Sequence, residues 1–200
     1  MVRWTAATAS PSNPLLPADP TGAGFIVSGA SAGGNLAAVM CQLARDGGLS
    51  PPLTGQYLCV PALLWPDAVP PKWQSSYRSR EECTSDPVLQ LSEASTASVL
   101  AALKPDTQSP LFSPLLHPNL SKLPPAFFQL GGLDPLRDEG LIYERVLREK
   151  HGIPTRLKVY EGYGHMFWTN WPEMERSREF WGDMVEGMRW LVELSQQRDK

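Results

Sequence analysis

Short apolar runs alternate with longer stretches of helical periodicity along the 200-residue sequence, and four of these runs are predicted as strands. The third run is apolar almost throughout, which is typical of a strand covered on both faces. Strands that alternate with helices predict a parallel α/β sheet flanked by helices. The predicted strands are the run that ends at Gly29 and residues 56–60, 125–131 and 155–160.

Three other stretches carry apolar residues at helical spacing. The helix after Ser31 ends at a Gly-Gly pair, and its predicted apolar face consists of Leu36, Met40, Leu43 and Ala44. The helix over residues 137–150 has acidic residues in its first turn and one apolar side, formed by Leu141, Ile142, Val146 and Leu147. The long helix over residues 172–196 is predicted to turn seven side chains inward: Phe180, Trp181, Met184, Val185, Met188, Leu191 and Val192.

Two segments lack a strand pattern. Residues 1–23 are predicted as a lead-in, with the end of a helix over residues 2–9 and then a proline-rich loop over residues 10–24. Residues 61–110 are rich in Pro, Trp, Ser and Arg, and only 86–103 has helical character, with Ser85 or Asp86 as its N-cap. We expect a single domain over residues 1–200, in which residues 61–110 form a cap-like insertion over the carboxyl edge of the sheet.

The composition argues against several classes of protein, including nucleic-acid-binding and membrane-spanning proteins. The net charge of −3 with mixed signs gives no basic face for nucleic acid. No apolar run reaches the length of a membrane span, and the amino-terminal residues lack the apolar core of a signal peptide. The three scattered cysteines predict neither a disulfide framework nor a zinc site, so a reducing, cytoplasmic setting is expected.

The first strand is followed by Gly29-x-Ser31-x-Gly33, the spacing of a nucleophile elbow. A serine on so sharp a turn needs small neighbours, because the strand and helix backbones approach each other closely. Ser31 would then lie at a helix N-terminus, where the N–H of Ala32 can point at a developing oxyanion. The structural alternative is a glycine-rich turn with an idle serine.

Two further reactive residues follow predicted strand ends, where ligands bind in parallel sheets. Asp134 follows the third strand and His165 the fourth, so the chain order is Ser, Asp, His, as in α/β-hydrolases. Taken alone, Asp134 could be a helix cap and His165 a buried loop histidine. Their joint placement after the elbow favours a triad for nucleophilic acyl transfer that requires no metal or organic cofactor. His117 and His151 fit the role of general base less well.

Five motifs run from the elbow to His165: Gly-Ala-Ser-Ala-Gly-Gly-Asn-Leu-Ala-Ala from residue 29, Ser-Pro-Leu-Leu from 113, Leu-Pro-Pro-Ala from 123, Gly-Leu-Asp-Pro-Leu-Arg-Asp-Glu-Gly from 132, and Gly-His-Met-Phe-Trp from 164. With these motifs the sequence resembles the hormone-sensitive-lipase-like branch of the α/β-hydrolases. The resemblance implies carboxylesterase activity, a cap over the site, a triad of Ser31, Asp134 and His165, and Ala32 as an oxyanion donor.

The sequence departs from this family in two places. Ala30 stands where the family usually has an acidic residue before the nucleophile. The His-Gly-Gly-Gly segment and the strands that precede the elbow in the family have no counterpart here. We therefore expect weak turnover by this chain alone, and an apolar edge strand that favours a homo-oligomer or a strand-complementing partner. A binding subunit without turnover, or a non-hydrolytic acyl transfer or cyclisation, are the alternatives to an esterase.

Aromatic residues near the insertion and the His165 loop suggest an apolar pocket for small to medium esters. The candidates for its wall are Trp65, Phe112, Met166, Phe167 and Trp168, with Trp73 nearby. Packing in the core or the cap is the alternative for each of them.

Overall fold

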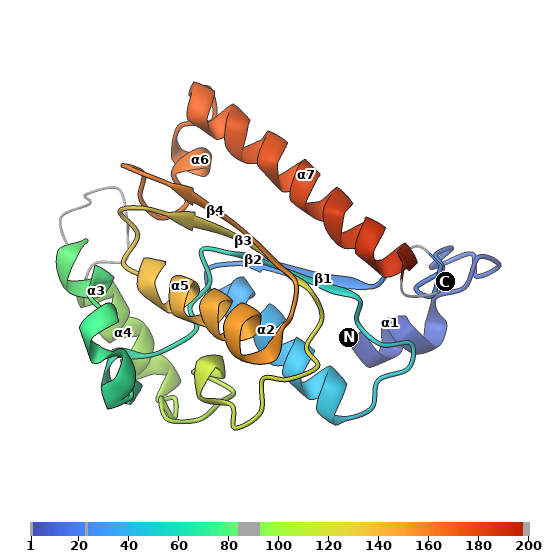
Figure 1. Ribbon diagram of the computed structural model, residues 1–200, viewed down its shortest axis with the longest axis horizontal. Coiled ribbons are helices and arrows are strands. Elements are labelled where there is room, and N and C mark those ends of the chain that lie inside the picture. Colours follow the sequence, from blue (N-terminus) through green and yellow to red (C-terminus); the bar gives the residue numbers. More distant parts are fainter. Residues whose placement is uncertain (1, 23, 84–92, 198–200) are drawn as a thin grey trace.

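A computed structural model describes residues 2–22, 24–83 and 93–197 of the chain. Its centre is a parallel sheet with the strand order β1-β2-β3-β4 (Figure 1). All four predicted strands are confirmed: β1 (Ile26–Ala30), β2 (Gly55–Cys59), β3 (Ala126–Gly131) and β4 (Thr155–Tyr160).

The register brings the carboxyl ends of the strands to one edge. Ala30 lies opposite Cys59, and Gly131 lies opposite Tyr160. Every residue of β2 and β3 is buried, whereas β1 and β4 have partly exposed residues because each lies at an end of the sheet. The loops that follow the strands therefore meet above one edge of a buried centre.

Helices cover both faces of the sheet. Figure 1 shows α2 (Ala32–Asp46) and α5 (Arg137–Arg145) on one face and α7 (Glu175–Gln197) on the other. Alternate strand residues supply the two cores: Leu58 and Phe128 pack on the α2 and α5 side, and Tyr57 and Phe127 pack on the α7 side. This alternation follows from the two-residue period of a strand.

The predicted helix over residues 137–150 is confirmed in extent, but its last five residues are π-helical and not α-helical. After α5 the backbone continues as a π-helical turn over Val146–Lys150. Ile142, Val146 and Leu147 are buried as predicted, and Leu141 is half-buried.

The predicted inward faces of α2 and α7 are wrong in part. Leu36 and Leu43 on α2 are 59% and 48% exposed, and Trp181 and Val185 on α7 are 45% and 51% exposed. On α2 the sheet is contacted mainly by small residues such as Ala38, whose side chains let the helix lie close to the strands. The larger apolar residues consequently remain on the outer side.

The segment between β2 and β3 contains no strand within its described part, as predicted. Its elements are η1 (Pro66–Ala68), η2 (Pro71–Ser76), α3 (Ser79–Glu82), α4 (Glu93–Leu103) and η3 (Pro114–Leu116). The predicted N-cap at Ser85 or Asp86 lies outside the described residues. Two short helices complete the fold, α1 (Val2–Thr8) and α6 (Phe167–Asn170), the second of which the sequence pattern did not predict. Within the described ranges, no helix is long and apolar enough to cross a membrane.

Candidate active site

Ser31 occupies the turn between β1 and α2 in a strained conformation. Its φ is 56° and its ψ is −119°, values that non-glycine residues rarely adopt. Three hydrogen bonds hold the turn: the Ser31 N–H donates to the Cys59 carbonyl (2.9 Å), and the Ser31 carbonyl accepts from the N–H groups of Asn35 (3.1 Å) and Ala62 (3.3 Å). Strain that is fixed by its surroundings in this way is common where a side chain must project from a turn.

The two glycines that flank Ser31 differ in how tightly they are packed. A Cβ added to Gly29 would lie 2.1 Å from the carbonyl oxygen of Gly33, so the close approach of strand and helix requires glycine at position 29. A Cβ on Gly33 would meet nothing within 4 Å. The expectation that both flanking residues must be small therefore applies to Gly29 and not to Gly33.

Asp134 and His165 reach Ser31 from the ends of β3 and β4. The Oδ2 atom of Asp134 lies 2.8 Å from Nδ1 of His165, and Nε2 of His165 lies 2.9 Å from Oγ of Ser31. Asp134 is held by the N–H of Leu136, which donates to Oδ1 at 2.8 Å. Asp134 and His165 are 1% and 6% exposed, whereas Ser31 is only half-buried. Ser31 is thus partly open to solvent, whereas Asp134 and His165 are not.

The His165 loop must turn back across the sheet to make these contacts. β1 and β4 are the two ends of the sheet, and three strand spacings of about 4.8 Å separate them by roughly 14 Å. Gly131 permits the crossing, because a Cβ there would lie 2.7 Å from the Tyr163 carbonyl oxygen. The Tyr163 carbonyl also accepts the N–H of Leu133 at 2.9 Å, which fixes the His165 loop against the Asp134 loop.

This arrangement can move a proton between a hydroxyl and an imidazole. The imidazole can accept the Ser31 proton at Nε2, and the buried carboxylate of Asp134 can orient the ring and stabilise its charged form. Ala32 is the first residue of α2, so its N–H has no acceptor within the helix, and the residue is exposed. Elsewhere in the described chain, no group of three His, Cys, Asp or Glu side chains is placed to hold a metal ion.

The first turn of α5, which follows Asp134, holds the segment after β2 in place. Oδ2 of Asp138 accepts the N–H groups of Arg78 and Ser79, both at 2.6 Å. Glu139 is fully buried, and its Oε1 accepts the N–H of Leu63 at 2.8 Å. Two carboxylates therefore anchor this segment through its backbone.

Side chains complete the surroundings of Glu139. Its Oε2 accepts the hydroxyl of Tyr77 at 2.8 Å and lies 3.2 Å from Nη2 of Arg80. Burial raises the pKa of the Glu139 carboxyl, and Arg80, Tyr77 and the Leu63 N–H act in the opposite direction. The sequence pattern placed Glu139 in a family motif and in the acidic first turn of its helix, and it did not point to Arg80 or Tyr77.

Trp65 and Phe112 form an aromatic pair beside this network. Their ring centroids are 5.4 Å apart, and the Arg80 guanidinium lies 4.9 Å from the Trp65 ring. Asn35, one turn after Ser31, donates from Nδ2 to the carbonyls of Ala62 and Phe112, each at 2.7 Å. Phe112 is therefore hydrogen-bonded to α2 through Asn35, and Trp65 is linked to α5 through Arg80, which pairs with Glu139.

The other predicted wall residues have different positions. Phe167 and Trp168 are 1% and 4% exposed, and the Trp168 ring stacks on Phe180 at 3.8 Å, so we correct their expected role from pocket wall to core. Trp73 is likewise buried in the core of the α2 side. Met166, directly after His165, is half-buried with a φ of 54°, and it packs against the same core on the α7 side.

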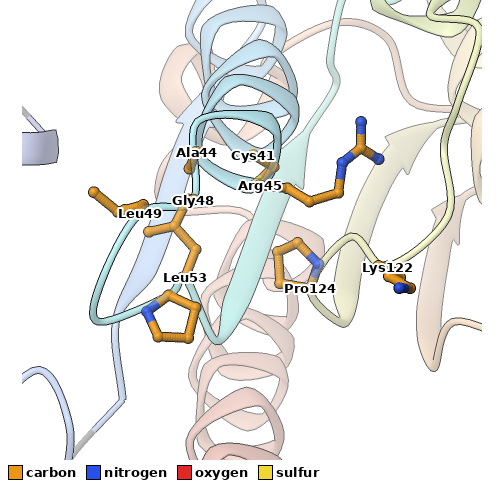
Figure 2. Close-up of a pocket in the computed structure, with 9 residues that line it drawn as sticks. Cys41, Ala44, Arg45, Gly48, Leu49, Leu53, Lys122 and Pro124 are labelled. Atoms are coloured by element: carbon orange, nitrogen blue, oxygen red, sulfur yellow. The ribbon is translucent and has the colours of Figure 1, made fainter.

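One cavity of about 270 Å³ lies at the far end of α2 from Ser31 (Figure 2). Its lining includes Cys41, Leu53 and Pro124, with Arg45 at one side. Arg45 is already paired with Asp46, at 2.7 Å from Nη2 to Oδ1. The cavity is thus separate from the Ser31 site.

The sequence profile of the alpha/beta hydrolase fold family matches residues 1–169. The chain is an α/β-hydrolase. It is 38% identical over 181 residues to an AB hydrolase superfamily protein of Schizosaccharomyces pombe, covering 88% of this chain and 51% of that one. It is 32% identical over 192 residues to the versiconal hemiacetal acetate esterase of Dothistroma septosporum, covering 95% and 56%.

The α/β-hydrolase assignment extends to solved structures. The crystal structure of vibralactone cyclase superposes on 97% of this chain and 55% of its own, with a TM-score of 0.87 and 38% identity. This chain therefore spans about half the length of the relatives it matches.

Proposed function

We propose that the chain carries the machinery of a serine carboxylesterase, with Ser31 as nucleophile, His165 as general base and Asp134 as the residue that orients the base. The main support is the pair of hydrogen bonds that link these three side chains. Nε2 of His165 lies 2.9 Å from Oγ of Ser31, and Nδ1 of His165 lies 2.8 Å from Oδ2 of Asp134. The similarity to the versiconal hemiacetal acetate esterase of Dothistroma septosporum supports the same chemistry.

The proposed reaction proceeds in two halves. His165 takes the proton of Ser31 as Oγ attacks the ester carbonyl, and the imidazolium then gives that proton to the leaving alcohol. Water, deprotonated by His165, attacks the acyl-enzyme and releases the acid and the free serine. Asp134 orients the ring and stabilises the imidazolium in both halves. The chain's own residues perform each step without a metal or organic cofactor.

The described residues of this chain stabilise the developing oxyanion only weakly. The N–H of Ala32 is the one donor that the turn supplies, and Ala32 is exposed. Removal of one oxyanion donor typically costs about 100- to 1,000-fold in turnover. We therefore propose that esterase turnover by the isolated chain is slow. If turnover were lost completely, the chain would act as a binding subunit.

Trp65 and Phe112 are the proposed wall for the apolar part of the ester, and Met166, the residue after His165, is a further candidate. We expect small to medium apolar esters to be preferred, since the wall is aromatic and its rings are partly exposed. A series of p-nitrophenyl esters of increasing acyl length tests this. Trp65→Ala should raise KM for the butyrate ester more than it lowers kcat, and preference for charged or sugar esters would contradict the proposal.

A second candidate is acyl transfer to a nucleophile within the substrate, which closes a ring. The similarity to vibralactone cyclase favours it specifically. The same triad would form the acyl-enzyme, and an internal hydroxyl would replace water in the second half. Product analysis in ¹⁸O-labelled water separates the two reactions, because only hydrolysis places the label in the released acid.

Labelling with a fluorophosphonate probe tests the nucleophile directly. The unaltered chain should be labelled and Ser31→Ala should not, while His165→Ala and Asp134→Asn should react more slowly, His165→Ala most of all. Ser28→Ala is a matched control, because Ser28 is an exposed serine three residues earlier in the same strand and turn region. Equal labelling of Ser31→Ala and the unaltered chain would refute the triad.

A further inference from the structure

The cavity at the end of α2 that lies far from Ser31 has a wall built from three segments (Figure 2). They are the last turns of α2 with the loop that follows it, the residues before β2, and the loop before β3. Because a helix rises about 1.5 Å per residue, the end of α2 at Asp46 lies roughly 20 Å from Ser31. A molecule in this cavity would therefore be out of reach of the Ser31 hydroxyl.

Most of the cavity wall is apolar. Its apolar members are Cys41, Ala44, Leu49, Pro52, Leu53 and Pro124. Cys41 and Leu53 are 1% and 6% exposed, so the inner side of the cavity is part of the core on the α2 side of the sheet. Burial raises the pKa of the Cys41 thiol, so the thiol stays neutral and adds to the apolar surface. The wall thus favours a hydrocarbon group over water.

Two cationic side chains lie together at one side of the cavity. Figure 2 shows the Arg45 side chain extending toward the side on which Lys122 lies, with Leu49 and Leu53 on the other side. Lys122 is exposed and has a left-handed backbone, with a φ of 56°. No ion pair joins Lys122 to a carboxylate in the part of the chain that the structure describes. The cavity is therefore apolar on one side and positively charged on the other.

The charge of Arg45 is only partly compensated by its neighbours. Its Nε donates to Oδ1 of Asp46 at 2.8 Å, and its Nη1 donates to the Ser121 carbonyl at 2.7 Å. Nη2 lies 2.7 Å from the same Asp46 oxygen without forming a well-directed hydrogen bond. The Asp46 side chain is 44% exposed, and its other oxygen lies 3.1 Å from Nε2 of His117. Because solvent weakens such an exposed pair, the field of Arg45 still favours an anion nearby.

We propose that this cavity binds an amphiphilic carboxylate, with its hydrocarbon tail against Leu49 and Leu53 and its carboxylate beside Arg45 and Lys122. An apolar cavity of about 150 Å³ holds benzene, so the volume of about 270 Å³ has room for roughly ten non-hydrogen atoms, the size of octanoate. A phosphate or sulfate fits less well, because the apolar wall could not replace its hydration. This binding is independent of the proposed esterase reaction.

Titration of the full chain with octanoate, followed in ¹H–¹⁵N NMR spectra, tests the proposal. We expect saturable binding, with shifts centred on Ala44, Leu49 and Leu53. Acetate lacks the tail and octylamine carries the opposite charge, so each should bind at least about tenfold more weakly. Octanol keeps the tail without a charge, and it should bind about threefold more weakly or worse.

Two substitutions test the charge and the space separately. Lys122→Met keeps an extended side chain without the ammonium group, and it should weaken octanoate about two- to fivefold while leaving octanol unchanged. Lys104→Met is the matched control, because Lys104 is also an exposed lysine with a left-handed φ, 45°, and it does not line the cavity. Ala44→Leu should weaken octanoate about tenfold or more by occupying the space of the tail, and its urea midpoint shows whether the chain is still folded.

Several results would overturn the proposal. The absence of saturable binding would do so, and so would equal affinities for octanoate, octanol and octylamine, which would indicate an unselective apolar crevice. Shifts centred on Trp65 and Phe112, or an octanoate affinity that neither Lys122→Met nor Ala44→Leu lowers, would place octanoate elsewhere. None of these measurements requires turnover, so a failure of the proposed esterase and a failure of this site are distinguishable.

Discussion

Gly29→Ala and Gly33→Ala should have opposite effects on stability, although the two glycines flank Ser31 symmetrically in sequence. At position 29 the new Cβ would lie 2.1 Å from the Gly33 carbonyl oxygen and 2.2 Å from its carbonyl carbon, and ordinary contact begins near 3.4 Å. The start of α2 would have to move by about 1.3 Å relative to β1 to reach that distance. Because the obstructing atoms are backbone, we expect a cost at the upper end of overpacking, about 3 kcal/mol.

At position 33 the new methyl group meets nothing within 4 Å and replaces a helical glycine. Alanine there should stabilise the folded chain by about 0.5–1 kcal/mol, because it reduces the backbone freedom of the unfolded state. Urea unfolding of the two variants measures the difference, which should be about 3.5–4 kcal/mol in total. Fluorophosphonate labelling should slow strongly in Gly29→Ala alone, since a shift of about 1 Å at the reacting group can cost about 100-fold. Equal urea midpoints for the two variants would refute this account of the turn.

Three further substitutions test the packing around the site. Glu139→Ala leaves the partly buried Arg80 without its carboxylate and should cost up to about 3 kcal/mol in urea unfolding; a loss below about 1 kcal/mol would show that the pair is screened by solvent. Gly187→Ala would place a Cβ 2.2 Å from an aromatic ring of β3 and should lower the melting temperature, whereas Gly182→Ala, with nothing within 4 Å, should raise it slightly; the reverse order would contradict the structure. Trp168→Ala should destabilise by about 3–5 kcal/mol and leave the relative rates over the ester series unchanged, and an altered ester preference would return Trp168 to the pocket wall.

The sequence predicted the strands and the meeting of Ser31, Asp134 and His165, because both depend on local patterns and on one general property of parallel sheets. Strand ends gather at one edge, so residues such as Asp134 and His165, each a few positions beyond a strand, were expected to meet. The distances among the three side chains agree with that expectation. Their catalytic roles remain a proposal.

The direction of the apolar helix faces could not be predicted in the same way. Periodicity shows that Leu36 and Leu43 share a side of α2, and it does not show whether the chain itself supplies a neighbour for that side. The packing surfaces of α2 were instead taken by alanine and cysteine, whose weight in a hydrophobic pattern is small. Phe167 and Trp168 were misplaced for a related reason, since an aromatic residue next to His165 can face either the site or the α7 core.

The network around Glu139 was beyond sequence reasoning because its members are far apart in the chain. Leu63 and Tyr77 are separated from Glu139 by 76 and 62 positions. No periodicity links them, and only the fold brings them together.

The anchoring of the segment after β2 has a consequence for how the substrate preference of such a molecule can change over time. Asp138 and Glu139 hold that segment largely by accepting backbone N–H groups, those of Arg78, Ser79 and Leu63. A backbone N–H is present whatever side chain a non-proline residue carries. Side chains such as Trp65 can therefore be exchanged during evolution while these attachments persist, and the wall that we propose for the ester can change with few compensating substitutions elsewhere.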